Sequence, residues 1–137
     1  MLVFVYLRAG SRMVVRSILL TVALLPYLYY GTKDNLYHFR GRRVSLVEHV
    51  LHLGVGVTIV GAIASAYRGR MSAMIGGLLL FLIVGATDEF IYHRGLPEHE
   101  TDLHAKGHMA LLLFVVVAVA TQWFAGRPWG AAIGLSG

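Results

Sequence analysis

Three pairs of titratable residues, two of Glu with His and one of His with His, share a spacing of four along the chain. The pairs are Glu48/His52, Glu89/His93 and His104/His108. Positions four apart on an α-helix differ by about 40° around its axis, so each pair forms one stripe on its helix. Imidazoles and carboxylates together are the ligands of non-haem iron and of catalytic zinc. The spacing therefore predicts a metal site between facing helices.

The elements that must position these pairs are long apolar segments. A helix needs about 20 predominantly apolar residues to cross a bilayer. Four segments meet this length, at about 13–30, 44–67, 71–92 and 103–124. We therefore predict an all-α integral membrane protein, with a single four-helix domain over 1–137 and a polar metal-ligand cluster at one membrane face. Whether Met1 or Met13 is the true start stays open.

Composition supports this class and excludes others. Hydrophobic residues make up 57% of the chain and charged residues 14%, with a mean hydropathy of +0.67. Soluble domains carry about 25% charged residues, so a soluble or disordered protein is excluded. The chain has no cysteine, which excludes thiolate ligands. Its net charge of +5 is not gathered in a basic stripe, so nucleic acid is not an expected partner.

The titratable residues divide unevenly between the two sides of the predicted bundle. Four spans place two expected loops, 31–43 (which contains Asp34) and 94–102, on the same side of the membrane. All seven acids and all seven histidines fall at or near this side. The opposite side carries only arginines. An ionisable group at membrane depth costs ~2.5 kcal/mol or more, so such groups usually face the bundle interior and mark function.

The paired residues can be sorted into two depths below this face. The layer nearer the interface holds Glu48, His93 and His104. The layer about one turn deeper holds His52, Glu89 and His108. Each layer has two imidazoles and one carboxylate, the ligand set of non-haem Fe(II). Two such layers predict a dinuclear centre. We expect His49 as a further ligand and Asp88 as a supporting group that orients an imidazole.

The remaining polar residues of this face are expected in loops over the mouth of the site: His38, Glu98, His99, Glu100 and Asp102. The His104-x-x-x-His108 spacing resembles one histidine box of the membrane di-iron desaturases and hydroxylases. The paired His-His boxes of that family are missing here, so its activity is not carried over.

The predicted function is redox chemistry with O₂ at an iron site, acting on a lipid or other apolar substrate. Zinc or copper is an alternative metal, and zinc bound by His52, His104 and His108 would suit a membrane hydrolase. Haem of the b type is disfavoured because Glu48, Asp88 and Glu89 crowd the histidines, where a porphyrin needs an apolar slot. A proton or cation transporter, a metal-binding accessory subunit and simple ion pairs near the headgroups are further alternatives.

Expected partners are membrane lipids, an apolar small molecule, and a second copy or a larger membrane complex. Lys and Arg counts on the two sides are equal. Arg8, Arg12 and Arg16 before or at the start of the first span, with Arg68 and Arg70 in a short loop, favour a cytoplasmic N-terminus. This orientation would place the metal face outside the cytoplasm.

Overall fold

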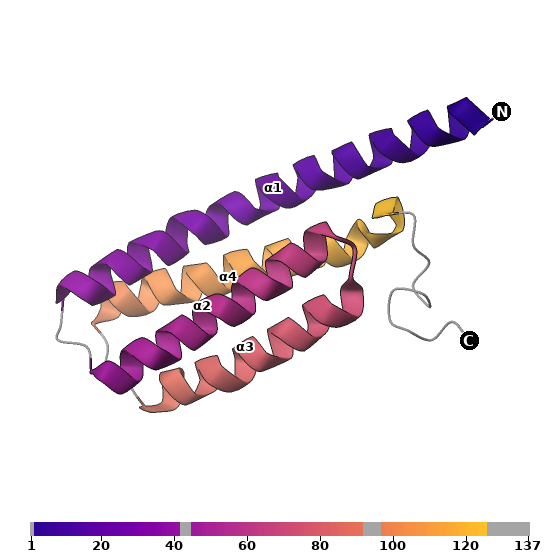
Figure 1. Ribbon diagram of the computed structural model, residues 1–137. Coiled ribbons are helices and arrows are strands. Elements are labelled where there is room, and N and C mark those ends of the chain that lie inside the picture. The colour runs from indigo at the N-terminus through magenta and orange to yellow at the C-terminus, as the bar shows by residue number, and fades with distance from the viewer. Residues whose placement is uncertain (1, 42–44, 92–96, 126–137) are drawn as a thin grey trace.

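Four long helices make up the fold (Figure 1). The computed structural model describes residues 2–41, 45–91 and 97–125, with side chains described from Ser11 onward except at 38, 39 and 41. The helices are α1 (Leu2–Gly41), α2 (Leu46–Tyr67), α3 (Met71–Ile91) and α4 (Glu98–Ala120), followed by the short 3-10 helix η1 (Gln122–Ala125). The described ranges contain no strand.

Each long helix contains a segment that is long and apolar enough to cross a membrane. These segments are 21 to 27 residues long, with a mean hydropathy of 1.6 to 1.8. Large apolar side chains such as Leu53, Val57 and Ile83 point outward and are more than 60% exposed. A membrane supplies the apolar surroundings that such a surface needs. The predicted all-α membrane fold of four helices is confirmed.

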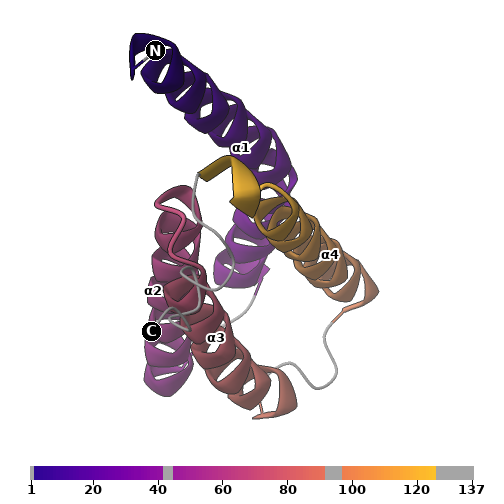
Figure 2. The ribbon, with the colours of Figure 1, turned by 90° about the vertical axis from the view of Figure 1, so that its right-hand side faces the viewer.

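The helices pack as two pairs, with α2 against α3 and α1 against α4 (Figure 2). The turn between α2 and α3 is short, and Gly69 adopts a φ of 64° there, which glycine allows without strain. A Cβ added at Gly77 of α3 would lie 3.0 Å from the Ala62 Cβ of α2. These two helices therefore approach closely through small residues, as membrane helices often do.

The end of the bundle that holds the α2–α3 turn is fixed by two buried polar side chains. Arg16 of α1 is only 1% exposed. Its guanidinium donates from Nη2 to the Ala66 carbonyl at 2.7 Å and from Nη1 to the Tyr67 carbonyl at 3.3 Å. Gln122 Nε2 donates to the Gly69 carbonyl at 3.1 Å. Carbonyls in the last turn of a helix and just beyond it have spare capacity to accept, and these side chains donate hydrogen bonds to them.

Two predicted loop boundaries are wrong. Helix α1 continues to Gly41 instead of ending near 30, so Asp34 is helical. Helix α4 begins at Glu98, so the acidic segment 98–102 is helical too. Pro97 precedes α4, and Glu98 and Glu100 lie in its first turn, where negative charge is favoured by the helix dipole.

Candidate metal centre

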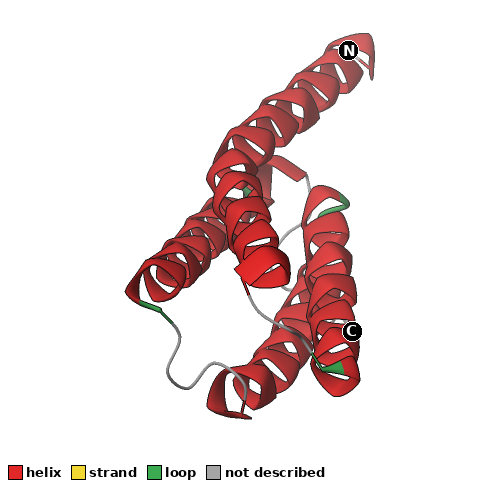
Figure 3. Ribbon diagram, turned by 90° about the vertical axis from the view of Figure 1, so that its left-hand side faces the viewer, coloured by secondary structure: helices red, strands yellow, loops and turns green. Residues whose placement is uncertain are grey.

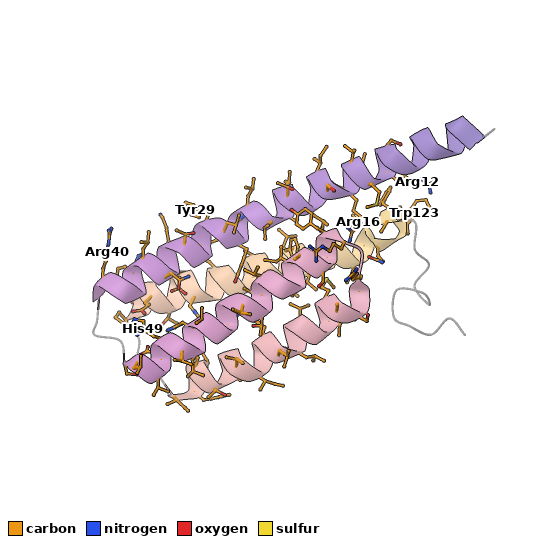
Figure 4. All side chains as sticks on the ribbon, in the orientation of Figure 1. Arg12, Arg16, Tyr29, Arg40, His49 and Trp123 are labelled. Atoms are coloured by element: carbon orange, nitrogen blue, oxygen red, sulfur yellow. The ribbon has the colours of Figure 1, made fainter. Side chains whose placement is uncertain are left out.

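A cavity of about 320 Å³ lies towards the end of the bundle where α1 ends and α2 begins, and residues of all four helices line it. Figure 3 views the bundle from this end. Figure 4 shows His49 and Arg40 at this end and Arg12, Arg16 and Trp123 at the other. Four carboxylates and three imidazoles line the cavity: Asp34, Asp88, Glu89, Glu100, His52, His104 and His108.

The first cluster of ligand atoms joins α2 to α3, and we call it the α2–α3 group (Glu48, His52 and Asp88). One ligand atom from each residue lies within 4.8 Å of the other two. His52 Nε2 is 3.2 Å from Asp88 Oδ2. Both carboxylates are buried, with Glu48 1% exposed and Asp88 4% exposed. Buried carboxylates need a compensating partner, and a metal ion is one that all three side chains could share.

Glu48 is held in place by the start of α2. Ser45 is the N-cap, and its Oγ accepts a hydrogen bond from the Glu48 backbone N–H at 3.2 Å. In return, Glu48 Oε2 accepts from the Ser45 backbone N–H at 3.4 Å. This is a capping box, which the Ser-x-x-Glu sequence favours. The helix start therefore fixes the carboxylate, and His52 follows one turn later on the same stripe.

The second cluster centres on α4, and we call it the His104 group (Asp34, Glu89, His104 and His108). His104 Nδ1 is 3.0 Å from Asp34 Oδ2 of α1, a residue 70 positions away. His104 Nε2 is 3.1 Å from Glu89 Oε2 of α3 and 2.9 Å from His108 Nε2. The imidazole of His104 therefore connects three helices.

The surroundings of His104 favour an added proton or a metal cation at this position. A neutral imidazole carries one N–H and one bare nitrogen lone pair. Whichever nitrogen carries the hydrogen, the other directs a lone pair at a carboxylate oxygen, from either Asp34 or Glu89. A second proton on the ring, a proton on the facing carboxylate, or a metal cation between Nε2 and Glu89 removes this repulsion.

Helix α3 serves both groups through two consecutive residues. Neighbours on a helix point about 100° apart. Asp88 accordingly faces His52 of α2, whereas Glu89 reaches His104 of α4. Asp88 is buried and the Glu89 side chain is 53% exposed. The pair of acids therefore links the two halves of the bundle across the cavity.

The structure groups the predicted ligands differently from the two predicted depths. Glu48 and His52 meet Asp88, which supplies a potential ligand atom where the sequence predicted a supporting role. Glu89 and His108, predicted together in the deeper layer, meet His104 of the other predicted layer in the His104 group. His49 lies outside both groups on the exposed side of α2, with Nδ1 2.9 Å from the Ser45 carbonyl oxygen. His93 lies outside the described residues.

Two residues of the site were not among the predicted ligands. Asp34 and the buried Glu100 both line the cavity, yet both were expected in loops. The acidic first turn after Pro97 was the signal that could have placed Glu100 on a helix. Comparison of the chain with models of protein families, with curated protein sequences and with solved structures finds no match.

Proposed function

We propose that the protein is a membrane metalloenzyme that holds two divalent ions at and beside its cavity. Glu48, His52 and Asp88 bind the first ion. The observation that carries this proposal is the meeting of these three side chains, from two helices, with ligand atoms within 4.8 Å of one another. Ligand atoms that lie about 2.0–2.2 Å from a shared ion are at most about 4.4 Å apart, so the three side chains would close inward around a bound ion.

The second ion is bound by Glu89, His104 and His108. The Nε2 atoms of the two histidines are 2.9 Å apart, and Glu89 Oε2 is 3.1 Å from that of His104. These separations match those of neighbouring ligand atoms around one ion. Asp34 holds His104 Nδ1, so that Nε2 is directed at the metal. A carboxylate that orients a metal-binding histidine in this way is a common arrangement in metal sites.

Iron and redox chemistry fit these groups best. The His104 group offers two imidazoles and one carboxylate, the set that non-haem Fe(II) sites use while keeping positions open for O₂ and substrate. Bound iron would supply electrons to O₂, and the chain's own side chains would hold the ions and position the substrate. The site lies within helices that cross a membrane, so the proposed substrate is a lipid or another apolar molecule.

Zinc hydrolysis is the second candidate, and one observation favours it. Catalytic zinc uses three protein ligands and a nearby general base. Each group offers three ligand atoms, and the carboxylate of Glu100 lines the same cavity while being only 4% exposed. Glu100 would then take the proton from water during hydrolysis.

Metal binding to purified variants tests the proposal. Wild-type protein in detergent, stripped with a chelator, is titrated with Fe(II) under anaerobic conditions and, separately, with Zn(II). We expect two equivalents for the wild type and one for His52→Ala. His99→Ala is the matched control, because His99 is exposed and its ring packs on Tyr37 at 5.2 Å between centroids. Absence of stoichiometric binding by the wild type, or equal losses in both variants, would refute the proposal.

A further inference from the structure

The end of the bundle that holds the α2–α3 turn carries arginines and, by sequence, no acidic side chain. All seven Asp and Glu residues lie near the other end, in the last turns of α1 and α3 and the first turns of α2 and α4 (Figure 1). The arginine-bearing end is formed from parts of 1–33, 49–87 and 103–137, and none of these stretches contains Asp or Glu. The chain therefore supplies no carboxylate side chain to balance the arginines there.

The short helix η1 packs against the α2–α3 turn at this end. Gln122 Nε2 donates a hydrogen bond to the Gly69 carbonyl at 3.1 Å. A Cβ added at Gly69 would lie 3.1 Å from the Cβ of Ala125. Arg68 and Arg70 flank Gly69 in the sequence, and both residues are exposed. The turn therefore presents two guanidinium groups beside η1.

A third arginine reaches η1 from α1. The guanidinium carbon of Arg12 lies 4.8 Å from the centre of the Trp123 ring (Figure 4). Trp123 is 56% exposed. Tryptophan is enriched at the level of the lipid head groups, because its ring is apolar and its N–H can meet water. We call these residues together the arginine surface: Arg12, Arg68, Arg70 and Trp123.

The arginine surface lies at the level where the bundle leaves the membrane. Arg68 and Arg70 lie between the membrane-spanning segments that end at Tyr67 and begin at Met71. Helix η1 contacts this turn and so holds the rest of the surface at the same level. Phospholipid head groups occupy this level of a bilayer, and a guanidinium can bind their phosphates through two hydrogen bonds.

The buried Arg16 adds positive charge beneath this surface. Its guanidinium donates to carbonyls at the end of α2, where the helix dipole supplies only part of a negative charge. The head group of a zwitterionic lipid carries no net charge, whereas an anionic lipid brings a full negative charge to this end of the bundle. The surface therefore favours anionic lipids over zwitterionic ones.

We propose that the arginine surface binds the phosphate of an anionic membrane lipid. The guanidinium groups of Arg68 and Arg70 contact the phosphate, and Trp123 lies beside the head group. This binding goes beyond the metal centre and does not depend on it, because the two lie at opposite ends of the bundle.

Quenching of tryptophan fluorescence by brominated lipids tests this surface in the full chain. Trp129→Phe removes the other of the two tryptophans and leaves Trp123 as the reporter. The protein is reconstituted in phosphatidylcholine bilayers, and phosphatidylglycerol or phosphatidylcholine with the same brominated chains is added in increasing amounts. The double variant Arg68→Gln with Arg70→Gln is compared in this background. Arg40→Gln is the matched control, because Arg40 is an exposed arginine at the opposite end (Figure 4).

We expect half-maximal quenching by brominated phosphatidylglycerol at a mole fraction at least about fivefold below that for brominated phosphatidylcholine. The reason is that one arginine beside an anionic head group changes binding by about fivefold. Arg40→Gln should keep this preference, and the double variant should lose it. Inorganic phosphate, added at constant ionic strength, should leave the preference unchanged.

Equal quenching by the two lipids in the protein with native arginines would overturn the proposal. Equal preferences in the double variant and in Arg40→Gln would overturn the assignment to Arg68 and Arg70. Loss of the preference when inorganic phosphate is added would identify a free phosphate ion as the ligand, and it would overturn lipid binding.

Discussion

The substitution Asp34→Asn tests whether Asp34 orients the metal ligand His104 without binding a metal itself. Asp34 Oδ2 lies 3.0 Å from Nδ1 of His104, on the side of the ring away from Glu89 and His108. Asparagine keeps the shape of the side chain and removes its charge. The imidazole then loses a charge-assisted hydrogen bond that fixes its rotation and increases the electron density on Nε2.

The expected effect is confined to one of the two ions. Supporting carboxylates of this kind change metal affinity by about 10–100-fold, which is about 1.4–2.8 kcal/mol. The side chains of His104 and Asp34 are 24% and 23% exposed, so solvent screens the contact in part. We therefore expect a loss of about tenfold at the His104 group, the lower end of the range. The α2–α3 group does not contact Asp34 and should keep its affinity.

Competition with a chromophoric chelator under anaerobic conditions measures both affinities. Asp102→Asn is the control, because Asp102 lies near the same end of the bundle and pairs with Lys106 at 2.6 Å on the surface. This variant should bind both ions as tightly as the wild type. An unchanged affinity in Asp34→Asn, or an equal loss at both sites, would refute the assignment of Asp34 as the residue that orients His104.

Two further predictions concern the scaffold and are measured by unfolding in detergent. Arg16→Met should lower the free energy of unfolding by about 2 kcal/mol, because it removes one buried and one partly buried charge-assisted hydrogen bond. Metal binding should be unchanged. Arg12→Met, which removes a contact between the guanidinium and the exposed ring of Trp123, should cost under about 1 kcal/mol. Gly77→Ala should destabilise by about 1–3 kcal/mol, because its Cβ would lie 3.0 Å from that of Ala62. Gly76→Ala, where a Cβ meets nothing within 4 Å, should be neutral or stabilising by up to about 1 kcal/mol. Equal effects within either pair of variants would contradict the packing described.

The four spans could be predicted from sequence because hydropathy and length alone decide which segments cross a membrane. The ends of the helices could not be predicted in the same way. Segment 31–41 is polar, yet α1 continues through it, and its Asp34 meets His104 of α4. A contact between residues 70 positions apart leaves no periodic pattern in the local sequence. Tertiary contacts therefore set this boundary.

The residue types of the site could also be predicted, but not their grouping. The spacing of four correctly places Glu48 beside His52 and His104 beside His108. Which way α3 turns Asp88 and Glu89 depends on the rotation of that helix within the bundle. The pattern of apolar residues does not reveal this rotation in a membrane protein, because lipid-facing and core-facing surfaces are both apolar. The structure supplies it, and each acid joins a different group.

The metal content of the protein as purified, without added metal, tests the central claim most directly. Element-resolved mass spectrometry combined with quantitative amino-acid analysis gives the ratio of each metal to the chain. The two groups described here predict two transition-metal ions per chain, with iron as the expected element. Protein that remains folded in detergent and contains no stoichiometric transition metal would contradict the claim.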